Sequence, residues 1–213
     1  MPLPASRHAA FATATALALF FAVSGGSFGR AWAFLDFGAG VLALVSLSVT
    51  VLWGLAATDR TLLGPGHRLV AQAVHRGTAV AGLGFLALHV WVKVAERSTT
   101  AAGAALPFAD AAQPLLVGLG TLAGYLFLAV AVTGAVRGVF ARSGRSRWWR
   151  ALHMCAYVAW GMALVHGLRA GRAASPWVTV SYALCLAAVT AVLTMRLAPG
   201  RNVPPSGRGK DPR

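Results

Sequence analysis

The feature that most constrains this chain is a series of six apolar runs, each long enough to cross a membrane. A bilayer core about 30 Å thick requires about 20 mostly apolar residues per helix, and backbone polar groups in hydrocarbon must be bonded within the chain. The six runs are Ala9–Gly25, Leu35–Thr58, Leu69–Ala95, Pro114–Val136, Trp149–Leu168 and Trp177–Leu197. The sequence therefore predicts an all-α membrane protein, a six-transmembrane-helix bundle over residues 1–198.

The composition excludes most other classes of protein. Of 213 residues, 57% are hydrophobic and only 11% are charged, whereas soluble domains carry about 25% charge. The net charge is +14, but the basic residues lie between the apolar runs and not among polar and aromatic residues, as a nucleic-acid surface requires. We therefore expect a multi-pass protein of the cell membrane that contacts lipid and no nucleic acid.

The positions of the basic residues predict the orientation. If the amino terminus is inside, fourteen of the nineteen Lys and Arg residues lie on the cytoplasmic face and five on the other, as the positive-inside rule requires. Both termini are then cytoplasmic. Residues 199–213 are basic and rich in Pro and Gly, so we expect a disordered cytoplasmic tail. The outer loop Ser98–Gln113 is a candidate for a small cap.

The first run has an alternative interpretation. Arg7 precedes it and Ala31-Trp32-Ala33 follows it, an arrangement that also fits a cleaved signal peptide. Cleavage would leave five spans in the same orientation.

Four of the six histidines lie inside apolar runs, where ionisable groups are costly and usually functional. His75 and His89 are 14 residues apart in the third run, and His153 and His166 are 13 apart in the fifth. At 1.5 Å per residue, each pair spans about 20 Å along its helix. Because both runs cross in the same direction, His75 is expected level with His153, and His89 level with His166.

The 13-residue spacing does not place both histidines on one face of an ideal helix. It turns His166 about 140° away from His153. A local distortion near Gly161, or cofactor planes turned relative to each other, would be needed for both to face the third run.

Two facing imidazoles are too few for zinc, which takes four ligands. They are sufficient for haem, whose porphyrin supplies four nitrogens and leaves two axial positions for histidine. The predicted ligands of two stacked haem irons are His75 with His153 and His89 with His166. Because there is no C-x-x-C-H motif, the haems are expected to be non-covalent b-type groups.

Basic residues accompany each histidine toward the water. The candidates for contact with haem propionates are Lys93, Arg169, Arg150 and Arg76. Snorkelling residues of the positive-inside kind explain the cytoplasmic ones equally well. Four glycines remove side-chain bulk where a flat macrocycle passes, although close helix packing uses glycine in the same way: Gly77, Gly82, Gly84 and Gly161.

The segments His75-Arg76 through Leu88-His89 and Trp149-x-x-Leu152-His153-x-x-x-Tyr157 through His166 resemble the ferric reductase-like transmembrane domain. That family is a six-helix, two-haem module of ferric reductases and NADPH oxidases, with histidines 14 and 13 residues apart. The resemblance covers all six runs. Complete enzymes of the family continue into a cytoplasmic FAD and NAD(P)H domain, whereas here about sixteen residues follow the last run, so the resemblance implies a stand-alone form. Quinol-oxidising cytochromes b resemble the chain less.

We therefore expect the haem-binding electron-transfer subunit of an oxidoreductase. Electrons would pass from a flavoprotein, a ferredoxin-like protein or a quinol to an unknown extracytoplasmic acceptor. Trp160 and Phe85 lie at intermediate depth, where packing is the favoured role for an apolar aromatic. One alternative is the haem-binding membrane subunit of a methionine sulfoxide reductase system. Another is an ion-coupled transporter with a histidine relay, although that function expects carboxylates at depth.

Overall fold

A computed structural model describes residues 27–58, 63–142, 145–169 and 176–197 of the chain, and within them it is helical with no strand. The helices are α2 (Ser27–Thr58), α3 (Pro65–Ala95), α4 (Ala101–Ala105), α5 (Pro114–Ala135), α6 (Arg137–Arg142), α7 (Ser146–Arg169) and α8 (Pro176–Leu197). In this part of the chain α2, α3, α5, α7 and α8 are long and apolar enough to cross a membrane. Five of the six predicted runs are thus confirmed as such helices. The first run, at 9–25, and the tail, at 199–213, lie outside the described residues.

Local sequence sets where these helices begin. Proline occupies the first position of α3, α5 and α8, a position where its missing N–H and fixed φ cost nothing. The predicted bounds agree with the observed ones to within four residues, except that α2 begins at Ser27, eight residues before the predicted run. The helix includes Arg30, which lies outside the apolar run, because arginine has a high helix propensity.

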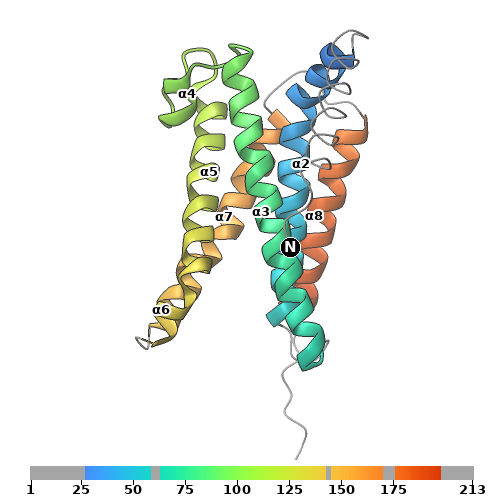
Figure 1. Ribbon diagram of the computed structural model, residues 1–213, viewed down its shortest axis with the longest axis vertical. Coiled ribbons are helices and arrows are strands. Elements are labelled where there is room, and N and C mark those ends of the chain that lie inside the picture. The colour runs from blue at the N-terminus through green and yellow to red at the C-terminus, as the bar shows by residue number, and fades with distance from the viewer. Residues whose placement is uncertain (1–26, 59–62, 143–144, 170–175, 198–213) are drawn as a thin grey trace, which may run out of the picture.

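The long helices form two antiparallel pairs, α2 with α3 and α5 with α7, and α8 packs on α2 (Figure 1). Helix α2 is the most enclosed of the five long helices. In its most apolar stretch 44% of the residues are buried, against 11–22% in the other four. Leu44, Leu47, Val51 and Leu55 of α2 are buried in one core cluster with residues of α5, α7 and α8. The other helices turn most of their apolar surface outward, as lipid-facing helices do.

The two pairs meet through α2 and α7 and diverge toward the end that carries α6 (Figure 1). At the crossing, Trp160 Nε1 of α7 donates a 2.8 Å hydrogen bond to Ser48 Oγ of α2. Both residues are buried. By contrast, no Cα atom of α3 comes within 8 Å of one in α7. Only side chains therefore bridge the space between these two helices.

The loop after α3 folds into a cap over one end of the bundle, as the sequence indicated. The Asp110 carboxylate accepts hydrogen bonds from Thr99 Oγ1 at 2.7 Å, Ala112 N at 3.0 Å and Gln113 N at 2.7 Å. The Thr99 hydroxyl, then the amides, hold the pKa of Asp110 below its ordinary range. Phe108, at φ 66°, lies against Gly118 of α5, where an added Cβ would be 2.7 Å from Phe108 Cε1. The contact between Phe108 and Gly118 thus holds the loop between α3 and α5 against the side of α5.

Candidate functional site

The structure brings the four histidines of the apolar runs together in two pairs across the space between α3 and α7. The ring centroids of His75 and His153 are 6.2 Å apart, and those of His89 and His166 are 6.3 Å apart. The first pair lies toward the α6 end and the second toward the α4 end. These are the partners expected from the spacing and the shared direction of the two runs.

The 13-residue spacing is accommodated without a break in α7, which is continuous α-helix from Ser146 to Arg169. The suggested distortion near Gly161 is therefore not found. Instead, the two imidazole planes cross at 57° in the first pair and at 80° in the second.

The separation between the rings can be compared with the spacing that each kind of bridge requires. An imidazole centroid lies about 1.1 Å from its nitrogen and a metal–imidazole bond is about 2.0–2.1 Å, so a linear N–metal–N arrangement places the centroids about 6.2–6.4 Å apart. A tetrahedral N–metal–N angle shortens this to about 5.2 Å, and a direct N–H···N hydrogen bond of about 2.9 Å gives about 5.1 Å. The observed 6.2 and 6.3 Å match the linear arrangement.

The other ring nitrogen of two of these histidines has a defined partner. Nδ1 of His75 lies 2.8 Å from the carbonyl oxygen of Thr50, and Nδ1 of His166 lies 2.7 Å from that of Leu116. A carbonyl oxygen only accepts, so Nδ1 carries the proton and donates it. The Nε2 lone pair is then left for a metal, the tautomer that histidine ligands require.

Four glycines on α2 and α5 make room for these rings, and the sequence analysis missed them. On α2, a Cβ added at Gly54 would lie 3.0 Å from His75 Cε1, and one added at Gly40 would lie 3.0 Å from His89 Nδ1. On α5, a Cβ at Gly120 would lie 2.8 Å from His166 Cε1, and one at Gly134 would lie 3.5 Å from His153 Cε1. The glycines are 14 residues apart on each helix. That repeated spacing, one span before each histidine span, is the signal that would have found them.

The glycines and carbonyl groups form one recurring arrangement. Thr50 and Leu116 precede Gly54 and Gly120 by four residues, so each glycine uncovers the carbonyl to which its own N–H is bonded in the helix. The α2–α3 and α5–α7 pairs therefore repeat the same glycine–histidine contacts, although the sequence shows no internal repeat.

His89 departs from this arrangement. Its Nδ1 is buried and has no hydrogen-bond partner in the part of the chain that the structure describes. Nearby, Lys93 Nζ pairs with Asp36 Oδ1 at 2.6 Å, with side chains 31% and 12% exposed. Lys93, expected from the sequence as a propionate partner, is thus held by a carboxylate in this structure.

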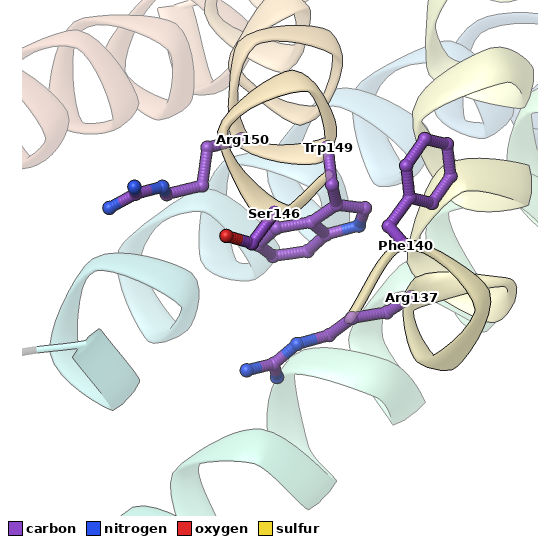
Figure 2. Close-up of a pocket in the computed structure, with 5 residues that line it drawn as sticks. All are labelled: Arg137, Phe140, Ser146, Trp149 and Arg150. Atoms are coloured by element: carbon purple, nitrogen blue, oxygen red, sulfur yellow. The ribbon is translucent and has the colours of Figure 1, made fainter. Parts of the chain in front are cut away.

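Of the remaining predicted cations, Arg150 and Arg169 lie near the two ends of α7, and Arg76 lies within α3. Arg76 and Arg169 are exposed, and Arg150 is an exposed residue beside a cavity with Arg137, Phe140, Ser146 and Trp149 (Figure 2). None of these residues touches a histidine pair through a described hydrogen bond.

Trp149 is a further residue of the site, to which the sequence analysis gave no role. Its indole stacks on the His153 ring at 5.0 Å and 17°, and its Nε1 donates to the carbonyl oxygen of Thr133 at 2.9 Å. Thr133 Oγ1 lies 3.4 Å from His153 Nδ1. Trp149 therefore fixes one face of this imidazole.

The aromatic residue between the two pairs is a packing residue. Trp160 is 8% exposed and, through Ser48, is tied to the Leu44 carbonyl oxygen by a 2.7 Å bond. Of the four glycines expected to flank a macrocycle, Gly82 instead permits close helix packing, because a Cβ there would lie 2.8 Å from Leu47 Cγ. The other three have nothing within 4 Å of an added Cβ: Gly77, Gly84 and Gly161.

The donor set fits a metal whose other ligands come from outside the chain. No group of three or more His, Cys, Asp or Glu side chains able to hold a metal ion occurs among the described residues. Cys155 and Cys185 are free. His75 with His153, and His89 with His166, could each hold a haem, which needs two ligands from the chain.

Comparisons with known proteins find no family model, no curated protein and no solved structure that matches this chain.

Proposed function

We propose that this chain carries electrons across a membrane through two non-covalent b-type haems, held by His75 with His153 and by His89 with His166. The observation that supports this is the pair of ring separations, 6.2 and 6.3 Å, which suit trans ligands of one metal and suit neither a tetrahedral ion nor a direct hydrogen bond. Two haem positions about 20 Å apart along α3 would divide electron transfer across the membrane into two steps.

The residues around the histidines define the chemistry available. When bound, a haem supplies a one-electron couple at its iron. A haem held by two of these histidines would have no place for a substrate at its iron, so the chain would exchange electrons only. The Thr50 and Leu116 carbonyls hold the protons of His75 and His166 at Nδ1. The Trp149 indole covers one face of the His153 ring, and the Trp160–Ser48 hydrogen bond joins α7 to α2 between the two pairs.

The proposed orientation rests on the basic residues. With both termini in the cytoplasm, fourteen of the nineteen Lys and Arg residues lie on the cytoplasmic side, as the positive-inside rule requires. His75 and His153 then lie on the cytoplasmic side. Electrons would enter there from a separate flavoprotein, a ferredoxin-like protein or a quinol, and leave near His89 and His166 for an extracytoplasmic acceptor. The resemblance to the ferric reductase-like family supports the same direction, with Arg76 and Arg169 as cations for propionates.

The test is the haem content of the purified chain. A pyridine haemochrome count and a dithionite-reduced minus oxidised spectrum should give two b-type haems per chain. His89→Ala and His153→Ala should each retain about one. His67→Ala is the matched control, because His67 is exposed at the start of α3, and it should retain both. A well-folded preparation without haem would contradict the proposal.

A further inference from the structure

The α6 end of the bundle carries a cavity of about 300 Å³. It is lined by Arg137 and Phe140 of α6 and by Ser146, Trp149 and Arg150 of α7. In Figure 2 both arginine side chains extend in the same direction beside the Trp149 indole, away from Phe140.

The polar groups of this cavity suit an oxyanion. Two guanidinium groups and one hydroxyl line it, and none of the lining residues is acidic. Arg137 lies over the Trp149 ring at 5.0 Å, and Trp149 is fixed by its hydrogen bond to the Thr133 carbonyl. Arginine binds phosphate with paired N–H donors. Because Arg137 is already stacked on an indole, its side chain loses less conformational freedom when it binds.

The apolar surroundings indicate where the anion comes from. All lining residues belong to α6 and α7, and one of them, Trp149, stacks on His153. Val139, Trp148 and Leu152 of the same helices are 57%, 60% and 47% exposed. In a membrane these side chains would lie against acyl chains, at the level where tryptophan meets headgroups.

We propose that this cavity binds the headgroup of an anionic phospholipid, with Arg137 and Arg150 on the phosphate and the acyl chains along the apolar surface of α6 and α7. Basic pockets between helices at the cytoplasmic surface bind such headgroups. At about 30 Å³ per water-sized group, a cavity of this size has room for a glycerophosphate of about ten heavy atoms. The proposal does not depend on haem. It assigns Arg150 to a lipid and not to a propionate, as the sequence suggested.

Native mass spectrometry of the full chain tests the lipid selectivity. The protein in detergent is titrated with phosphatidylglycerol and, separately, with phosphatidylcholine of the same acyl chains. Wild type should retain one phosphatidylglycerol at concentrations that leave phosphatidylcholine unbound. Equal retention of the two lipids would overturn the proposal without any variant being made.

The variants locate the site. Arg137→Gln and Arg150→Gln should each weaken phosphatidylglycerol binding about fivefold, and the double variant about 30-fold, the loss expected for one and two surface guanidinium contacts. Arg147→Gln is the matched control, because Arg147 is an exposed arginine of α7 that does not line the cavity. It should bind as wild type does. Weakening by Arg147→Gln to the same extent would show a general charge effect and contradict the site.

Two further results separate the sources of the anion. If excess inorganic phosphate displaced phosphatidylglycerol, the site would be one for free anions and the lipid assignment would be wrong. Haem content is measured in each sample. If haem-loaded protein excluded phosphatidylglycerol and haem-free protein bound it, the cavity would belong to a propionate. Lipid selectivity in protein without haem would support the lipid site even if the proposed electron transfer failed.

Discussion

Replacing Gly120 by alanine should remove one haem and leave the other. The added Cβ would lie 2.8 Å from Cε1 and 2.9 Å from Nδ1 of His166. Ordinary carbon contacts are about 3.5–4.0 Å, so the ring must move away by about 0.7–1.2 Å. The 2.7 Å hydrogen bond to the Leu116 carbonyl then lengthens beyond the normal range of about 2.7–3.2 Å.

The energies of this change can be estimated separately for the fold and for the site. A buried donor left unpaired costs about 1–3 kcal/mol, and alanine in place of glycine in a helix interior returns about 1 kcal/mol. The free energy of unfolding should therefore fall by only about 0–2 kcal/mol. The metal site is less tolerant, because ligand distances must hold within about 0.2 Å.

Gly134→Ala is the matched control on the same helix. Its Cβ would lie 3.5 Å from His153 Cε1, an ordinary contact, so only the helix-propensity gain of about 1 kcal/mol applies. Haem content by pyridine haemochrome and Tm by circular dichroism are the measurements. Gly120→Ala should hold about one haem and Gly134→Ala two. Combined with His153→Ala, Gly120→Ala should hold none, and combined with His89→Ala it should keep one. Equal haem content in the two glycine variants would refute the argument.

Three further predictions concern contacts outside the metal sites. Ser48→Ala removes the acceptor of the buried Trp160 N–H and should lower the free energy of unfolding, measured by thermal melting, by about 1–3 kcal/mol. In a Trp160→Phe background the same substitution should cost much less. An equal cost in the two backgrounds would show that the hydrogen bond does not stabilise the fold. Lys93→Gln removes the ammonium group that pairs with the 12%-exposed Asp36 carboxylate at 2.6 Å and should destabilise by about 1–3 kcal/mol after allowance for partial exposure, whereas the double variant with Asp36→Asn should regain most of this. The pKa of Asp110 is held low by a threonine hydroxyl and two backbone amides, so its contribution to the cap is complete above the ordinary carboxyl pKa and is lost as the pH falls through the lower, folded value. Hydrogen exchange of residues 99–113, corrected for intrinsic rates, should show protection declining in acid for wild type, and a similar decline in Asp110→Asn would exclude this carboxylate as the cause.

The sequence was sufficient for the helices because a membrane acts on each apolar run separately. Whether Pro114–Ala135 crosses as a helix depends on its length and composition, both of which are local. The histidine partners were predictable for a related reason. Once the third and fifth runs are parallel, a separation of 14 or 13 residues fixes which histidines share a depth.

The contacts between helices were beyond the reach of this reasoning. Gly120 and His166 are 46 residues apart and lie on different helices, and nothing in a single run shows which face meets a neighbour. For the same reason Lys93 was expected near a propionate, although it pairs with Asp36, 57 positions away.

The sequence by itself determined that the chain forms apolar helices, which residues carry ionisable groups at depth, and how those groups are spaced. The tertiary structure alone decided that α2 is the enclosed helix, that α3 and α7 stay apart with two imidazole pairs between them, and that glycine on α2 and α5 leaves room for those rings. The physical reason is the range of the forces involved. Transfer into hydrocarbon is a property of each segment, whereas close packing depends on the shapes of surfaces that only folding brings together.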